Sequence, residues 1–140
     1  KAAIDKHKLS DKVVFTGQVQ YYDMQQMLKN ADVLALCRQN KHQAEGGFPT
    51  KLGEYLSTGN PVLVTNVGDM ELYIKDGING FDSEPNNIEM FRNKLDFIAN
   101  HYDEAKLIGQ KGIGLVHSSF NYKKQTNIIL QSIKTIISKR

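Results

Sequence analysis

Short apolar runs alternate along the chain with longer stretches in which apolar residues recur at helical spacing. The apolar runs predict short strands at residues 13–16, 33–37, 62–64 and 80–82. The amphipathic stretches predict helices at residues 1–8, 21–30, 49–58, 70–75, 88–100, 104–116 and 122–138. Strands that alternate with helices are usually parallel and joined by right-handed crossovers. The pattern therefore predicts an α/β fold, a doubly wound parallel sheet with helices on both faces.

The segment at residues 45–65, EGGFPTKLGEYLSTGNPVLVT, holds most of the strong local signals. A glycine pair and Pro49 exclude the interior of a helix, because glycine is entropically costly there and proline lacks the amide hydrogen. Proline fits the first helical turn, so a helix is expected to start at Pro49. Gly59 is the expected C-terminal cap, and Pro61 prevents the helix from continuing. The apolar run 62–64 is typical of a fully buried parallel strand.

The same segment places a lysine and a carboxylate on consecutive turns of one helix. Lys51 falls in the first turn, where backbone amides favour anions, and Glu54 follows one turn later. Gly17, Arg38 and Gly68 each follow a predicted strand, so their loops should gather at the carboxyl edge of the sheet, where ligands bind in such folds. The pattern predicts a site for an anionic ligand that carries hydroxyl groups.

Composition narrows the class of protein. The 140 residues suit one domain, 1–140, and 40% apolar with 24% charged residues is ordinary for a globular protein. The net charge of +3 is spread along the chain without a basic block interleaved with aromatics, which argues against a nucleic-acid partner. Cys37 excludes an internal disulfide and is expected to be a packed core thiol. No His or Cys cluster has metal-ligand spacing, so neither a metal nor another cofactor is expected.

Several motifs, in this order and spacing, give the chain a family resemblance. They are VFTG at 14–17, ADV at 31–33, GFPTKLGEYL at 47–56, GNPV at 59–62, VGD at 67–69 and DGINGF at 76–81. From about residue 12 to 136 the chain resembles the carboxyl-terminal, donor-binding half of retaining glycosyltransferases with the GT-B fold (family 4, group 1). The resemblance implies a Rossmann-like domain that binds a nucleoside-diphosphate sugar of the UDP or GDP type, as substrate rather than cofactor.

The resemblance also implies roles for individual positions. The loops at Gly17, Gln18 and Val19 and at Arg38 should flank the nucleotide base. Glu54 corresponds to the family glutamate that accepts hydrogen bonds from the ribose hydroxyls, and a carboxylate suits a vicinal diol. The backbone amides around Gly46, Gly47 and Phe48 should face the donor sugar and diphosphate, and Lys51 and Leu52 are expected at the same site. Lys51 would stabilise the leaving diphosphate, and no residue of the chain is predicted to act as a nucleophile.

The chain departs from the family pattern at the first of two glutamates. Members usually carry two glutamates with seven residues between them, and counting back from Glu54 reaches Gly46, while Glu45 lies one place away. Either Glu45 takes the role of the first glutamate or the glycine backbone replaces it. The Gly-Gly-Phe-Pro run favours the glycine backbone.

The chain is expected to be a piece of a longer enzyme. It starts without methionine and in mid-pattern, and it lacks the basic pair and the amino-terminal acceptor domain that family members carry. The isolated piece should therefore fold and transfer little or no sugar. By analogy, the whole protein would serve bacterial polysaccharide biosynthesis in the cytoplasm, with a glycan or lipid-linked acceptor and peripheral membrane association at the inner face as an option.

Two other functions stay open from the residues alone. A nucleotide-sugar 2-epimerase shares the fold but needs extra His and acidic residues near the donor motif, which the chain does not show. A non-enzymatic Rossmann-like binding module of the receiver type needs an acceptor aspartate just after a strand, whereas Asp32 precedes one. Selective binding of one nucleoside diphosphate, weakened by Glu54→Ala, would separate a donor domain from such a module.

Overall fold

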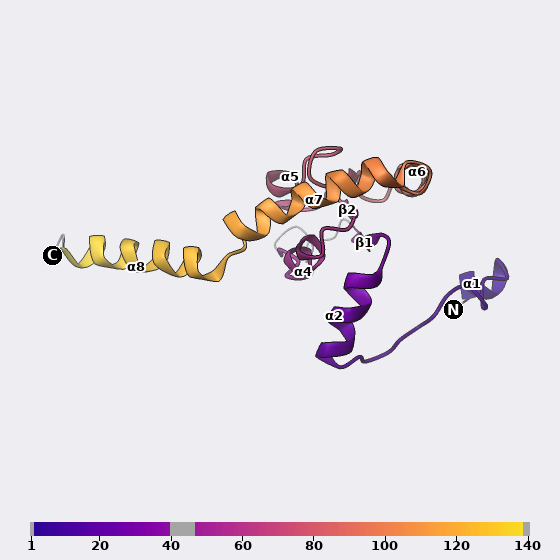
Figure 1. The fold of residues 1–140 in the computed structure, drawn as a ribbon, viewed down its shortest axis with the longest axis horizontal. Coiled ribbons are helices and arrows are strands. Elements are labelled where there is room, and N and C mark those ends of the chain that lie inside the picture. The colour runs from indigo at the N-terminus through magenta and orange to yellow at the C-terminus, as the bar shows by residue number, and fades with distance from the viewer. Residues whose placement is uncertain (1, 40–46, 139–140) are drawn as a thin grey trace.

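A computed structural model describes residues 2–39 and 47–138 of the chain (Figure 1). Three strands form a parallel sheet in the order β1-β2-β3, with β1 at Leu34–Leu36, β2 at Val62–Thr65 and β3 at Phe81–Ser83. Leu34 pairs with Val62, and Leu63 pairs with Phe81. The predicted parallel α/β architecture is confirmed, and β3 is an edge strand as expected.

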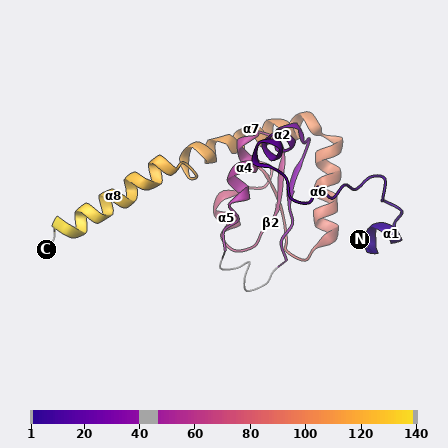
Figure 2. The same cartoon turned by 90° about the horizontal axis from the view of Figure 1, so that it is seen from below.

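The helices lie where the apolar spacing predicted them, with small shifts at the ends. They are α1 (Ala2–Lys6), α2 (Tyr21–Asn30), α4 (Lys51–Ser57), α5 (Met70–Tyr73), α6 (Ile88–Asn100), α7 (Tyr102–Ser118) and α8 (Tyr122–Ser138). Helices α4 and α5 lie on one side of β2, and α6 lies on the other (Figure 2). The sheet is therefore covered on both faces.

The central strand β2 explains why both faces need a cover. All four of its residues are buried, and successive side chains point to opposite faces of a strand. Val62 and Val64 join an apolar cluster that contains Leu52 and Leu56 of α4. Leu63 joins a second cluster with Phe81, Ile98 and Ile108 from β3, α6 and α7. The continuous apolar run of β2 thus contributes side chains to the apolar clusters on both faces of the sheet.

Two sequence predictions about the first strands are wrong. Residues 13–16 form no strand: Val14 is 83% and Phe15 65% exposed in an extended segment without ladder partners among the described residues. An apolar run becomes a strand only where a neighbouring backbone completes its hydrogen bonds. Cys37, expected in the core, is exposed because β1 ends at Leu36, so that the thiol lies beyond the packed part of the strand.

The turn between α4 and β2 is a packing centre. Gly59 has a φ of +67°, which confirms the predicted left-handed helix cap. Asn60 is buried, and its side-chain amide donates hydrogen bonds to the carbonyls of Leu28, Lys29 and Ala31 at distances of 3.3, 3.2 and 2.7 Å. The Lys106 ammonium of α7 donates to the Asn60 side-chain oxygen. One asparagine therefore joins the end of α2, the α4–β2 turn and α7.

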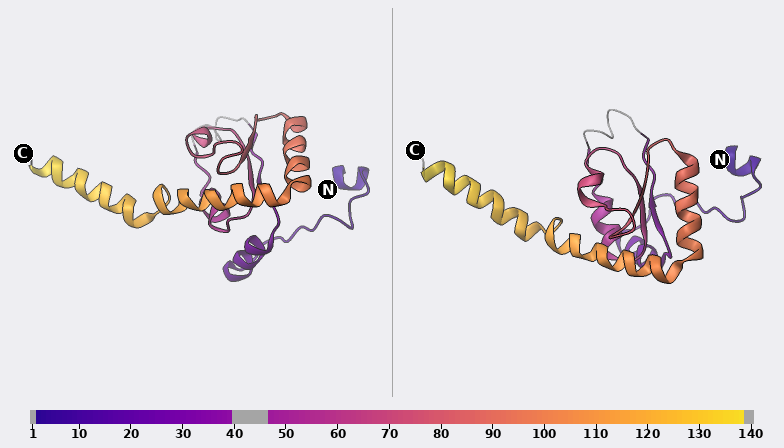
Figure 3. Two further views of the ribbon diagram at one scale, coloured as in Figure 1. Left: turned by 45° about the horizontal axis from the view of Figure 1, so that its top comes forward. Right: turned by 90° about the horizontal axis from the view of Figure 1, so that it is seen from above.

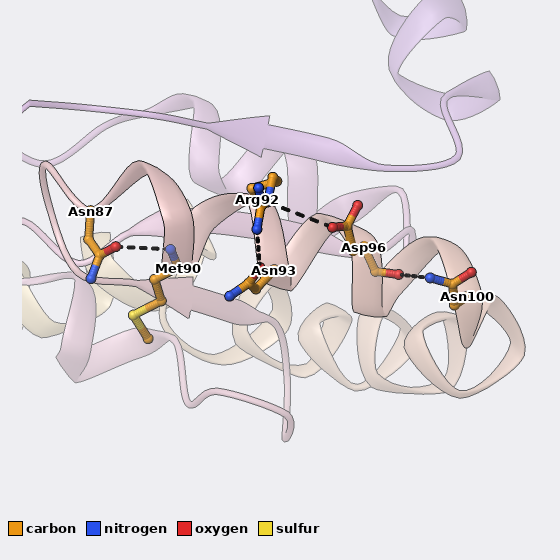
Figure 4. Close-up of polar contacts among 6 residues, drawn as sticks. All are labelled: Asn87, Met90, Arg92, Asn93, Asp96 and Asn100. Atoms are coloured by element: carbon orange, nitrogen blue, oxygen red, sulfur yellow. Dashed lines mark hydrogen bonds and ion pairs between the residues drawn. The ribbon is translucent and has the colours of Figure 1, made fainter.

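Helix α6 shows how local signals set a boundary. The Asn87 side chain accepts a hydrogen bond of 2.9 Å from the Met90 amide and caps the helix (Figure 4). Further along, Arg92 forms an ion pair of 3.9 Å with Asp96 on the exposed face. The Asn87 cap explains why the helix starts at Ile88.

Helix α8 extends away from the sheet (Figures 1 and 3), and each of its residues is exposed. The exposed apolar side chains of this helix include Ile128, Ile129, Leu130, Ile133, Ile136 and Ile137. Among the described helices, none combines the length and apolar character that crossing a bilayer requires.

Asp82 in β3 provides a pH-dependent test of the edge of the sheet. Burial raises the pKa of the Asp82 carboxyl and Asp76 raises it further, while Lys94 and Lys75 lower it. A carboxyl whose pKa is higher in the folded than in the unfolded state destabilises the fold when ionised, and this cost disappears as the pH falls through that pKa.

Asp82→Asn should therefore raise the thermal unfolding midpoint slightly at pH 7, and the gain should shrink as the pH falls to about 4, near the ordinary pKa of aspartate. Thermal unfolding at pH 7, 5 and 4 measures this, with Asp96→Asn on exposed α6 as the control. A lower midpoint at pH 7, or a gain that does not change with pH, would contradict the assignment.

Candidate functional site

At the carboxyl edge of the sheet, two hydrogen bonds join the end of β2 to the residues that follow β1. Thr65 ends β2, and its hydroxyl accepts a hydrogen bond of 2.8 Å from the Arg38 amide and donates one of 2.9 Å to the Arg38 carbonyl. Both backbone groups of Arg38 are thereby held against the neighbouring strand. The side chain of Arg38 leaves the sheet from a fixed point.

The Arg38 guanidinium contacts Gly47, which lies shortly before α4 in the chain. Its Nη1 donates a hydrogen bond of 2.9 Å to the Gly47 carbonyl. A guanidinium carries five N–H donors, so this bond leaves it the capacity to bind an anion as well. Arg38 and Gly47, both predicted for the donor site, are therefore brought together. Glu45 and Gly46, the two candidates for the first glutamate position, lie outside the described residues.

The Phe48 ring anchors the start of α4. It lies 4.9 Å from the ring of Tyr73 and 5.5 Å from that of Phe120, measured between ring centroids. Tyr73 and Phe120 are themselves 5.2 Å apart. Aromatic rings at such separations attract each other beyond their buried area. The Phe48 side chain thus fixes the start of α4 against α5 and Phe120, and the predicted donor contact of Phe48 is one of its backbone amide.

Helix α4 separates its predicted ligand residues from its packing residues. Lys51 and Glu54 are exposed, whereas Leu52 is fully buried in the core. A side-chain contact between Leu52 and a donor is therefore excluded, because the helical period turns this position toward the sheet; only its backbone could face a ligand. Lys51 and Glu54 lie three residues apart and so share one side of the helix.

Glu54 opens into a groove between α2 and α4, which we call the α2–α4 groove. Its volume is about 230 Å³, and its lining residues are Tyr21, Met24, Gln25, Leu28, Lys29, Glu54, Ser57 and Thr58. Met24 and Leu28 are half-buried and form an apolar floor, while the remaining side chains supply polar walls. A carboxylate beside an apolar floor and an aromatic ring can hold a hydroxylated ligand with a flat ring.

The predicted base-flanking loop lies outside the α2–α4 groove. Gly17, Gln18 and Val19 belong to the extended segment before α2 and do not line the α2–α4 groove. Gly17 has a φ of +63° in open space, which suits a turn rather than a close approach. The structure brings Tyr21 and Gln25 beside Glu54, two residues to which the sequence analysis assigned no role. Their spacing with Met24 and Leu28 shows that these residues share one face of a helix, but the sequence does not show which element packs against that face.

A larger cavity, of about 590 Å³, lies on the other face of the sheet between β3, α6 and α7. Its lining carries the carboxylates Asp76, Glu84, Glu89 and Glu104 against a single lysine, Lys94, among the described residues. That lysine is already paired with Asp76. A diphosphate would be repelled there, so size alone does not make this cavity the donor site.

Among the described residues, no group of three or more His, Cys, Asp or Glu side chains could hold a metal ion.

Comparison of the sequence with known protein families gives one match. The model of the family "Glycosyl transferases group 1" matches residues 1–115. No curated protein matches the chain in sequence.

Solved structures similar to the chain are glycosyltransferases. Sucrose-phosphate synthase from Thermosynechococcus elongatus is 19% identical, with a TM-score of 0.86 over 99% of this chain and 34% of that one. A glycosyltransferase from Rickettsia africae is 23% identical, with a TM-score of 0.86 over 99% of this chain and 36% of that one. Anabaena HepE in complex with UDP-glucose is 19% identical, with a TM-score of 0.83 over 96% of this chain and 35% of that one.

The chain thus spans about a third of the length of these structures, and at such identities the likeness shows the fold. Two observations support the same assignment: the parallel sheet is covered on both faces, and the family model matches most of the sequence. The chain belongs to the glycosyl transferases group 1 family and has the fold of one Rossmann-like domain of a GT-B glycosyltransferase.

Proposed function

We propose that this chain is the donor-binding domain of a retaining glycosyltransferase and that it binds a nucleoside-diphosphate sugar of the UDP type. The observation that carries the proposal is the exposure of Lys51 and Glu54 on one side of α4, the helix that follows the Arg38–Gly47 contact in the chain. An anion-binding lysine and a diol-binding carboxylate in this order match a diphosphate joined to a ribose. A similar structure, Anabaena HepE, was solved with UDP-glucose and with UDP and glucose, which supports the choice of donor.

In this proposal the domain stabilises the leaving group rather than forming a bond to the sugar. Lys51 and the Arg38 guanidinium would offset charge that develops on the diphosphate as the bond to the anomeric carbon breaks. Glu54 would fix the ribose and so place the diphosphate beside them. The acceptor, a glycan or lipid-linked sugar, would be bound by the rest of a longer protein in polysaccharide biosynthesis in the cytoplasm. The isolated chain is accordingly expected to bind the donor and to transfer little sugar.

Calorimetric titration with UDP, GDP and ATP tests the donor site. Glu54→Ala should weaken UDP binding by about tenfold, since a hydrogen bond to a charged group contributes roughly 1.5–3 kcal/mol and tenfold corresponds to about 1.4 kcal/mol. Glu71→Ala, which removes an exposed carboxylate from α5, is the matched control and should leave the affinity unchanged. Equal binding of all three nucleotides, or no binding of any, would overturn the proposal in favour of a binding module.

A further inference from the structure

Three aromatic rings from distant parts of the chain meet beside the start of α4, and we call them the aromatic cluster: Phe48, Tyr73 and Phe120. Phe120 lies in the link at residues 119–121, between α7 and α8. The backbone of this link is fixed on both sides. The amide of Phe120 donates a hydrogen bond of 3.1 Å to the Leu115 carbonyl. The Gln125 side chain donates one of 2.9 Å to the Ser119 carbonyl, so the Phe120 ring enters the cluster from a fixed point.

The peptide unit between Gly47 and Phe48 is held at both ends. The Gly47 carbonyl accepts the hydrogen bond from Arg38. The Phe48 ring packs on Tyr73 and Phe120, with centroid separations of 4.9 and 5.5 Å. The Gly47 carbonyl and the Phe48 N–H belong to one planar peptide unit. Holding the carbonyl at one end and the ring at the other therefore fixes the direction of the Phe48 N–H, the group that is expected to face the donor diphosphate.

The Phe120 side chain also contacts α4 itself. A Cβ at Gly53 would lie 3.7 Å from the Phe120 Cβ and 3.8 Å from its Cγ, which is ordinary van der Waals contact. Gly53 lies between Lys51 and Glu54 in the sequence of α4. Phe120 is half-buried, and it packs against the apolar cluster to which α4 and β2 contribute. One side chain thus contacts both the loop and the helix of the proposed donor site.

We infer that Phe120 is a positioning residue of the donor site: it holds the Phe48 N–H and the first turn of α4 in the arrangement that binds a diphosphate, without touching the ligand itself. This inference rests on the proposed function, because the Phe48 amide and Lys51 are the expected diphosphate contacts. A loop that occupies its binding position for only a fraction of the time binds with an affinity reduced by that fraction. Loss of the Phe120 ring should therefore weaken donor binding although the groups that contact the ligand remain.

Calorimetric titration with UDP tests this role. Phe120→Leu should weaken UDP binding roughly three- to tenfold, the factor that corresponds to the energy of one aromatic pair. Phe120→Tyr keeps the ring and should bind UDP like the wild-type chain. Tyr122→Leu is the matched control and should leave the affinity unchanged, because Tyr122 is an aromatic residue close to Phe120 in the chain that is 73% exposed and outside the aromatic cluster.

A double variant shows whether Phe120 acts through Phe48. Phe48→Leu alone should weaken UDP binding to a similar extent. Combined with Phe120→Leu, it should weaken binding by less than the product of the two single losses, because residues that act through a shared contact give non-additive effects. Losses that multiply would show that Phe120 affects binding independently of the loop, and they would overturn the inference.

The other outcomes separate this inference from the donor site itself. If Phe120→Leu binds UDP normally while Glu54→Ala does not, the donor site stands and the positioning role is wrong. A loss for Phe120→Tyr or Tyr122→Leu equal to that for Phe120→Leu would also overturn it. If the wild-type chain binds no UDP, both proposals fail.

Thermal unfolding of each variant shows whether it is folded at the temperature of the titration. Phe120→Met, which keeps an apolar side chain of similar length, replaces Phe120→Leu if the latter does not fold. Failure of both variants to fold would make Phe120 a residue of the core alone and would overturn the inference.

Discussion

Gly109→Ala is expected to destabilise the fold by about 1–3 kcal/mol, the usual range for inserting a carbon into a packed interface. A Cβ at Gly109 would lie 2.6 Å from the carbonyl carbon and oxygen of Asn60 and 2.7 Å from the Pro61 nitrogen. These are backbone atoms of the turn between α4 and β2, which cannot move aside as a flexible side chain could. The substitution would push α7 away from the turn on which the central strand depends.

Gly114→Ala is the matched control on the same helix. A Cβ at Gly114 meets no atom within 4 Å among the described residues, so only the helix propensity changes. Alanine is favoured over glycine inside a helix by about 1 kcal/mol, and this variant should be slightly more stable. Thermal or urea unfolding of both variants measures the difference. Equal midpoints for the two variants would contradict the close approach of α7 to the Asn60–Pro61 backbone.

Asn60→Ala is expected to destabilise the fold by roughly 1–3 kcal/mol, the usual cost of leaving a buried polar group without its hydrogen-bond partner. The variant leaves the carbonyls of Leu28, Lys29 and Ala31 without their shared donor, and it removes the acceptor of Lys106. The end of α2 would lose its tether to the rest of the domain.

The control for this prediction is Asn100→Ala. Asn100 also donates a side-chain hydrogen bond, of 2.8 Å to the Asp96 carbonyl, but on the exposed face of α6 (Figure 4). Unfolding by urea should show a change within about 0.5 kcal/mol for Asn100→Ala, as expected of surface positions. A loss for Asn60→Ala no larger than that of the control would show that the buried network contributes little.

The elements that depend on local signals could be predicted from the sequence. The helices 88–100 and 122–138 were expected with the boundaries that the structure shows, because their apolar residues recur with a clear helical period. The break at Gly59 and the buried strand that follows were also predicted, since glycine and proline restrict the backbone wherever they occur. The doubly wound α/β class followed from the alternation of these elements.

The parts that depend on distant partners could not be predicted. Residues 13–16 have a strand-like composition, yet a strand requires a neighbour that the pattern does not supply. The packing of the Phe48 ring on Tyr73 and Phe120 could not be predicted, because these two rings lie far along the chain. Tyr21 could not be assigned to the candidate site, because the spacing on α2 shows a face without showing that Glu54 lies opposite it.

The most direct test of the donor site is a titration of the isotope-labelled chain with UDP, followed by amide NMR. The account predicts that the largest shifts fall at Lys51 and Glu54 of α4 and at Arg38 and Gly47 at the carboxyl edge of the sheet. The cavity between β3, α6 and α7 should show small shifts, because its carboxylates disfavour a diphosphate. Shifts concentrated around that cavity, with α4 unchanged, would contradict the account.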